Sequence, residues 1–148
     1  MNEHMENAPF VALIDDDQHS AHLLTRMLLA EGSPRVQWYG DAVRGHARLV
    51  DVLTDPSAHW PSLVIVDLKS HSCANMDFLR SIQPLPHQKG VSMVAMVHAS
   101  ESDQREALED CGAAAIFFRH ADRDAYRREA ASLVSFWARS QRPVAVGM

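Results

Sequence analysis

The 148-residue chain has few cysteines, no long apolar run and no excess of positive charge. Its two cysteines, Cys73 and Cys111, are too few for a disulfide scaffold and are typical of a reducing compartment. The longest uninterrupted apolar run is residues 113–118, which is too short for a transmembrane helix, and the acidic start of the chain does not resemble a signal peptide. We therefore expect a cytoplasmic protein that does not enter a membrane.

The overall composition is 47% hydrophobic and 22% charged residues, a balance typical of a single folded domain. The net charge of −5 argues against a nucleic-acid-binding surface over the whole protein. We expect one domain over residues 1–148, with a core at about 10–139 and flexible tails at 1–8 and 141–148.

Apolar segments recur along the chain at nearly even spacing, and the residues between them have the apolar spacing of helices. The five segments are FVALI at 10–14, VQWY at 36–39, LVIV at 63–66, VSMVAMV at 91–97 and AIFF at 115–118. Most are continuously apolar, as strands covered on both faces are. The alternation predicts an α/β fold with one doubly wound parallel sheet of five strands and helices on both faces. We expect the strand order 2-1-3-4-5.

Acidic residues follow two of these strands. Asp15, Asp16 and Asp17 come after the first strand, and Asp67 comes directly after the third. An acidic run after one strand is by itself usually only a helix N-terminus. Two sets of acids at the carboxyl edge of a parallel sheet instead predict a pocket, because open α/β sheets bind ligands there. Clustered carboxylates favour Mg²⁺, and a carboxylate beside such a cation can accept a phosphoryl group.

With these acids the chain resembles the receiver domain of two-component response regulators, over about residues 10–137. VALIDDD resembles the family's first strand and acidic pair, LVIVDL its third strand and phosphoacceptor, and GAAAIFFRH the approach to its fifth strand. The resemblance implies that Asp67 is the phosphoacceptor. It also implies that Mg²⁺ is held by Asp15, Asp16, Asp67 and the backbone carbonyl of Lys69. The side chain of Lys69 would either form a salt bridge with Asp67 or contact the phosphoryl group.

The chain departs from the family pattern at several functional positions. Arg119 stands where the family has a lysine, and arginine keeps the charge but has a different geometry. The switch position, where the family has serine or threonine, falls on Val97, which has no hydroxyl group. A shift of the alignment by one to three residues would put His98 or Ser100 there instead.

The resemblance implies a histidine kinase or phosphotransfer protein as phosphoryl donor, a downstream protein as target, and no enzymatic activity. No DNA-binding domain is evident in the sequence. The alternative is a degenerate receiver that acts as a phosphorylation-independent interaction module, because the lysine and hydroxyl positions are substituted. A flavodoxin-like FMN-binding protein would share the topology. The loop DDDQHS after the first strand argues against it, because a phosphate-binding loop needs glycines, hydroxyls and free N–H groups.

The residue pattern of the last expected helix, roughly residues 122–139, predicts a contact with another protein. Tyr126, Leu133 and Trp137 lie on the stripe expected to cover the sheet, whereas Phe136 lies off it. We expect that two adjacent large aromatics do not both face inward. Phe136 and the arginines of this helix therefore predict a homodimer or target surface. The alternative is that Phe136 packs against the end of the chain and the charges are simply solvated.

Overall fold

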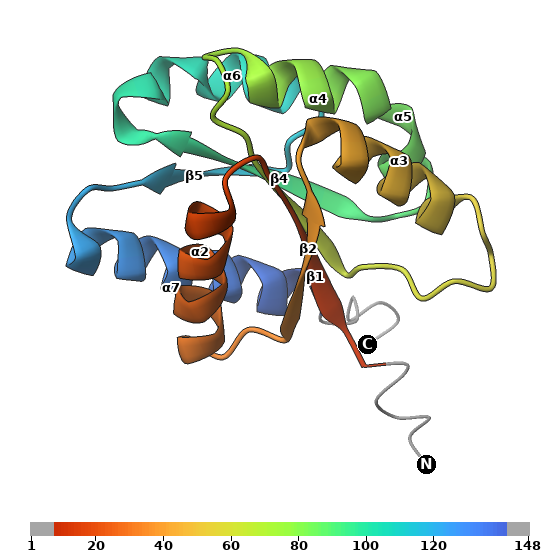
Figure 1. Cartoon of the computed structure of the whole chain (residues 1–148), viewed down its shortest axis with the longest axis horizontal. Coiled ribbons are helices and arrows are strands. Elements are labelled where there is room, and N and C mark those ends of the chain that lie inside the picture. Colours follow the sequence, from red (N-terminus) through yellow and green to blue (C-terminus); the bar gives the residue numbers. More distant parts are fainter. Residues whose placement is uncertain (1–7, 142–148) are drawn as a thin grey trace, which may run out of the picture.

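The computed structural model describes residues 8–141, and the predicted tails at 1–8 and 141–148 lie almost entirely outside that range. Five parallel strands form one sheet between two layers of helices (Figure 1). The strand order is β2-β1-β3-β4-β5, which confirms the predicted 2-1-3-4-5 topology. The strands are β1 (Phe10–Asp15), β2 (Arg35–Gly40), β3 (Leu63–Asp67), β4 (Ser92–His98) and β5 (Ala115–Arg119).

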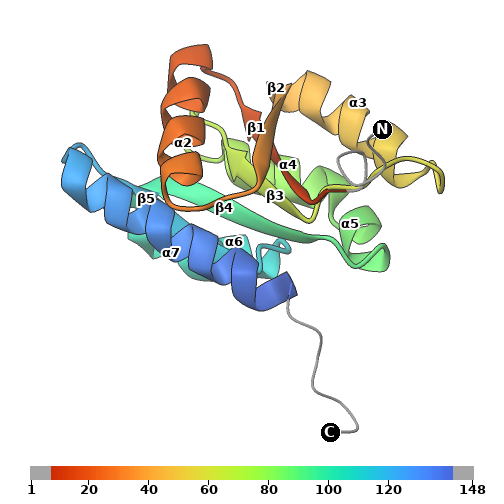
Figure 2. The same cartoon turned by 90° about the horizontal axis from the view of Figure 1, so that it is seen from below.

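Helices cover both faces of this sheet. One face is covered by α2 (Gln18–Ala30) and α7 (Arg123–Gln141), which contact each other, and α7 also packs on β5 (Figure 2). The other face is covered by α3 (Ala42–Leu53), α4 (Ala74–Ile82), α5 (Pro84–Gln88) and α6 (Arg105–Asp110). No helix among residues 8–141 has the length and apolar character needed to cross a membrane.

Alternate side chains of the central strands enter two separate cores, one on each face of the sheet. In β1, Leu13 packs with the α2 and α7 side, whereas Ile14 packs with the α3 to α6 side. All six residues of β1 and all five of β3 are buried, as expected for strands covered on both faces. In the edge strand β2 only Tyr39 is buried. Because β1 and β3 lie side by side in register, their last residues, Asp15 and Asp67, both lie at the carboxyl edge of the sheet.

Local capping explains where α2 begins and ends. The carboxylate of Asp17 accepts a hydrogen bond from the backbone N–H of His19 at 3.0 Å, which satisfies a donor of the first turn. The helix is followed by Gly32 at φ 95°, a left-handed conformation that glycine adopts without strain. Asp17 is therefore a helix cap, and the acids left for the pocket are its two predecessors.

The crossover between β3 and β4 is more divided than a single helix. Pro84 begins α5 directly after α4, because proline has no N–H to continue the preceding helix. After β4 the chain forms the 3₁₀ helix η1 (Ala99–Gln104), whose first residues are capped by the side chain of His98. These two irregular segments lie at opposite ends of β4.

The expectation that adjacent aromatics of the last helix do not both face inward is wrong. Phe136 packs edge-on against Phe117 of β5, with ring centroids 6.0 Å apart. Trp137 is also partly buried, and its Nε1 donates a hydrogen bond to the Oγ of Ser62 at 2.9 Å. Both rings fit because one contacts the last strand while the other contacts the residue that precedes β3. The alternative prediction, that Phe136 packs against the end of the chain, concerns residues outside the described range.

Candidate functional site

Two buried carboxylates face each other at the carboxyl edge of the sheet. Asp15 ends β1, Asp67 ends β3, and the two residues are direct partners in the parallel register. Both side chains are 0% exposed. Burying an ionised carboxylate is costly unless a cation or hydrogen-bond donors compensate its charge. The sequence prediction that acids of two adjacent strands converge is borne out for this pair, and the pair must be neutralised locally.

One neutralising group is the ammonium of Lys69, two residues beyond Asp67. Its Nζ lies 2.7 Å from Asp15 Oδ1 and 3.3 Å from Asp67 Oδ1. The same Nζ donates a hydrogen bond to the backbone carbonyl of Asp67 at 2.8 Å. The salt bridge from Lys69 to Asp67 matches one of the two predicted roles of this side chain. The shorter contact with Asp15 was not anticipated from the sequence.

The second neutralising group is the guanidinium of Arg119 at the end of β5. Its Nη1 donates a hydrogen bond to Asp67 Oδ1 and another to the backbone carbonyl of Met96 at 3.0 Å. Arg119 therefore reaches the predicted phosphoacceptor from across β4. Two cations therefore offset the charges of the two buried carboxylates, Asp15 and Asp67.

Asp16 lies beside the pair but turns its carboxylate to the backbone. Both of its oxygens accept from the N–H of Lys69 at 3.1 Å, and Oδ2 also accepts from the N–H of Ser70 at 3.0 Å. These bonds fasten the loop after β3 to the loop after β1. Asp16 is thus placed next to the pocket while its own oxygens are engaged.

Asn75, at the start of α4, is a buried polar residue whose role sequence reasoning missed. Its Oδ1 accepts from the N–H of Leu68 at 2.8 Å, and its Nδ2 donates to the carbonyl of Met96 at 2.8 Å. The side chain thus joins the residue after Asp67 to β4, at the same carbonyl that Arg119 contacts. Its position in the loop after an acidic strand end was the only sequence signal.

Burial raises the pKa of Asp15 from 3.8 to about 6, and the neighbouring Asp67 acts in the same direction while Lys69 opposes it. Burial also raises the pKa of the Tyr126 hydroxyl, with Asp67 contributing. Tyr126 belongs to α7, and its buried hydroxyl makes no hydrogen bond within residues 8–141. The pocket is therefore shielded from water, so that an ionised acid in it costs folding free energy.

The candidate switch residues lie at the end of β4 and just beyond it. Val97 is 2% exposed and belongs to the core on the α3 to α6 face. His98 and Ser100 are exposed, and their side chains are hydrogen-bonded to each other at 2.8 Å. Within residues 8–141, none of these three side chains forms a hydrogen bond with Asp67. Their assignment stays a prediction.

Two oxygens of the pocket are suited to a hard divalent cation. Asp15 Oδ2 and Asp67 Oδ2 are buried and have no hydrogen-bond partner in the part of the chain that is described. Such oxygens are the ligands that Mg²⁺ prefers. Among residues 8–141, however, no three His, Cys, Asp or Glu side chains are gathered closely enough to hold a metal together. Completing a metal site therefore requires Asp16 and Lys69 to rearrange.

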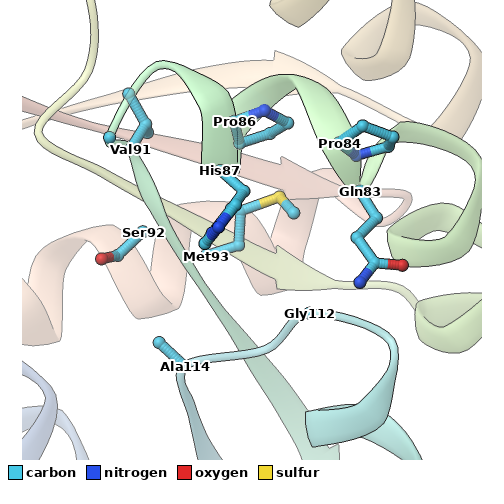
Figure 3. A pocket seen from close by; sticks show the side chains of 10 residues that line it. Gln83, Pro84, Pro86, His87, Val91, Ser92, Met93, Gly112 and Ala114 are labelled. Atoms are coloured by element: carbon cyan, nitrogen blue, oxygen red, sulfur yellow. The ribbon is translucent and has the colours of Figure 1, made fainter.

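Two cavities differ in their relation to this pocket. A cavity of about 410 Å³ is lined by Asp15, Asp16, Trp38 and Arg44, so it borders the acids directly. A larger cavity, of about 520 Å³, lies at the amino end of β4 beneath α5, where Pro84, His87, Met93 and Gly112 line it (Figure 3). The second cavity lies at the opposite edge of the sheet from Asp67 and plays no part in the candidate site.

Comparison with solved structures agrees with this geometry. The structure superposes on a phosphorylated cyanobacterial phytochrome response regulator, RcpA, with a TM-score of 0.73 at 18% identity, covering 90% of this chain and 96% of that one. It also matches a response regulator receiver domain from Rhodospirillum rubrum, with a TM-score of 0.68 at 19% identity, covering 90% of this chain and 96% of that one. The Mn²⁺-bound form of response regulator Rcp1 gives a TM-score of 0.67 at 16% identity, covering 87% and 94%. The chain has the receiver fold.

The sequence itself matches no protein-family model and no curated protein. At these identities the structural likeness shows the fold, and what the receiver pocket does in this chain must be argued from its own residues. A divalent cation is bound in one receiver of this fold, Rcp1. That pocket, with its acids at the ends of β1 and β3, is the site from which a function is derived.

Proposed function

We propose that this chain is a receiver of a two-component system, which accepts a phosphoryl group on Asp67 from a histidine kinase or phosphotransfer protein. The observation that carries the proposal is the position of Asp67. Its carboxylate ends β3, is fully buried, and is flanked by the cations of Lys69 and Arg119. Positive charge on both sides suits a group that gains negatively charged phosphoryl oxygens.

The free oxygen of Asp67 is the expected nucleophile. Oδ1 is bonded to both cations, whereas Oδ2 makes no hydrogen bond within residues 8–141. In the transfer, the P–N bond of a phosphohistidine breaks, a P–O bond to Asp67 forms, and the leaving imidazole keeps the electron pair and takes a proton from water. Arg119 then donates to the phosphoryl oxygens. Mg²⁺, held by Asp15, Asp16, Asp67 and the carbonyl of Lys69, would neutralise charge between the phosphoryl group and the acids.

The proposal includes the setting and the output. We place the protein in the cytoplasm, as a phosphoryl acceptor rather than an enzyme with its own substrate, and expect its signal to pass by contact with a downstream protein. The surface proposed for that contact, or for a homodimer, is the exposed side of α7. Arg127 and Arg128 are exposed there, so an acidic partner surface would be complementary.

A second function is favoured by one specific observation. Lys69 and Arg119 already balance the charges of Asp15 and Asp67 without a phosphoryl group. A pocket that is satisfied in this way is consistent with a degenerate receiver that acts as a phosphorylation-independent interaction module. The two functions differ in one chemical outcome, the covalent modification of Asp67.

The test is to incubate the protein with a small-molecule phosphodonor such as acetyl phosphate and with Mg²⁺, and then to measure the intact mass. We expect one labile phosphoryl adduct, absent in Asp67→Asn and reduced in Asp16→Asn. Asp51→Asn, at an exposed position of α3, is the matched control and should retain the adduct. An adduct that survives Asp67→Asn overturns the assignment. A folded wild type that never gains an adduct supports the interaction module instead.

A further inference from the structure

The ammonium of Lys69 has the surroundings of a bound cation. Its Nζ contacts three oxygens: Asp15 Oδ1 at 2.7 Å, Asp67 Oδ1 at 3.3 Å and the Asp67 carbonyl at 2.8 Å. An ammonium group has three N–H donors, and three acceptors surround this one. The side chain is 24% exposed, so most of it is covered by the protein. The contacts join the ends of two adjacent strands through one positive charge.

The backbone holds this lysine in place. The N–H of Lys69 donates to both oxygens of Asp16, and the next N–H, of Ser70, donates to Asp16 Oδ2. These bonds fix the start of the loop after β3 directly beside the acid pair. A long lysine side chain normally loses considerable conformational entropy when it is ordered. Here a fixed backbone and three acceptors offset that cost.

Charge counting shows what the lysine does to a second cation. Asp15, Asp16 and Asp67 carry three negative charges, and Lys69 and Arg119 carry two positive ones. With Lys69 in place, the pocket attracts an added divalent cation less strongly than the acids would without it, because an ammonium a few ångströms away repels the cation. If the ammonium of Lys69 moved away, the net negative charge of the pocket would increase and would attract the incoming cation more strongly.

We propose that Lys69 is a built-in counter-ion, which occupies the place between Asp15 and Asp67 and must leave before a divalent cation binds there. Lys69 therefore lowers the affinity of the pocket for Mg²⁺ and links the loop after β3 to the acids. This inference concerns the resting pocket and holds whether or not Asp67 is phosphorylated. Its test uses no phosphodonor, so its failure is distinguishable from failure of the proposed function.

The chain offers an unusually clean measurement, because Lys69 and Lys89 are its only lysines. Lys89 is exposed near the amino end of β4, where its Nζ lies 5.8 Å from the ring centre of Trp60. With ¹⁵N-labelled lysine, we expect the wild-type Lys69 ammonium to give a slowly exchanging Nζ signal. Adding Mg²⁺ should shift that signal toward the position of a solvated ammonium and leave the Lys89 signal unchanged.

Calorimetric titration of Mg²⁺ into variants supplies the second readout. Lys69→Met should bind Mg²⁺ about tenfold more tightly than wild type or better, because the competing charge is gone while the stem is kept. Lys69→Arg should stay as weak as wild type, and Lys89→Met is the matched control that should not differ from it. Circular dichroism melts establish that each variant is folded before titration.

Three results would overturn the inference. The first is a wild-type Lys69 signal that exchanges as fast as that of Lys89, because this would show that the ammonium is not held by the acids. The second is an equal Mg²⁺ affinity in wild type and in folded Lys69→Met. The third is a Lys69 signal that does not move while Mg²⁺ binds, since the cation would then enter without displacing the lysine.

Discussion

The guanidinium of Arg119 is hydrogen-bonded to the carboxylate of Asp67 although β4 lies between the strands that carry them. Arg119 crosses that strand at the carbonyl of Met96, which accepts its second hydrogen bond at 3.0 Å. The side chain of Asp67 is 0% exposed and that of Arg119 is 16% exposed, so the ion pair is largely excluded from solvent. Removing Arg119 leaves Asp67 buried with Lys69, whose Nζ lies 3.3 Å from Asp67 Oδ1, as its remaining cation.

Arg119→Gln should therefore destabilise the protein strongly. We expect a loss of about 3 kcal/mol in the free energy of unfolding, and a loss of about 1 kcal/mol in Arg119→Lys, which keeps the charge. Urea unfolding followed by circular dichroism measures both. Arg127→Gln, on the exposed side of α7, is the matched control and should change stability little.

A double variant separates the ion pair from simple loss of packing. In Arg119→Gln/Asp67→Asn the charge of Asp67 is gone as well, so we expect part of the stability lost in Arg119→Gln to return. If the two substitutions are instead additive, the pair contributes no coupling energy, and the stabilising role assigned to Arg119 is wrong.

Asp15 should make the stability of the protein depend on pH. Burial raises its pKa from 3.8 to about 6, so the folded state binds this proton more tightly than the unfolded state. The stabilisation is fully present below 3.8 and is lost as the pH rises through about 6. A rise of this size corresponds to roughly 3 kcal/mol, which the ionised carboxylate costs the folded protein at higher pH.

Asp15→Asn removes that titration. We expect this variant to be more stable than wild type at about pH 8, with the difference shrinking at about pH 5, where wild-type Asp15 is mostly protonated. Urea midpoints at the two pH values give the comparison. Asp51→Asn serves as the control, and its stability relative to wild type should be the same at both pH values. A variant that is less stable than wild type at the higher pH would show that the salt bridge with Lys69 outweighs burial.

The sequence predicted the sheet because its evidence is local and repeated. Each strand is a short apolar run, and the alternation of strands with helices predicts parallel crossovers, whereas the order 2-1-3-4-5 is the one expected for the receiver fold. Strand ends then placed Asp15 and Asp67 correctly, since parallel strands end at one edge. The division of the crossover at Pro84 was missed, although proline is a local signal.

The contacts inside the pocket were harder to predict because they depend on side-chain direction. Lys69 was expected to contact either Asp67 or the phosphoryl group, but its closer bond to Asp15 depends on how the loop after β3 turns. That turn is set by Asp16 and the backbone, which no spacing rule describes. The prediction for Phe136 was wrong for a related reason. The apolar stripe of a helix describes one line of contact, whereas the last strand and the residue before β3 together accept both aromatic rings.

The assignment of Val97 as the switch position can be tested by substitution, because Val97 is buried in an apolar core. It is 2% exposed, and the carbonyl of the residue before it, Met96, accepts from Arg119. Val97→Thr places a hydroxyl of nearly the same shape in an apolar core. We expect this to cost about 1–3 kcal/mol of unfolding free energy in the resting protein.

The same hydroxyl should become useful when the pocket holds a phosphoryl mimic. If Val97 is the switch position, beryllofluoride with Mg²⁺ should raise the melting temperature of Val97→Thr by more than it raises that of wild type, because the hydroxyl then gains a charged acceptor. Val94→Thr is the matched control: Val94 is also buried in β4, but it faces the α2 and α7 core. This control should lose stability and gain no extra stabilisation from beryllofluoride. Equal gains in all three proteins would exclude Val97 and direct the search to His98 and Ser100, which lie just beyond the strand.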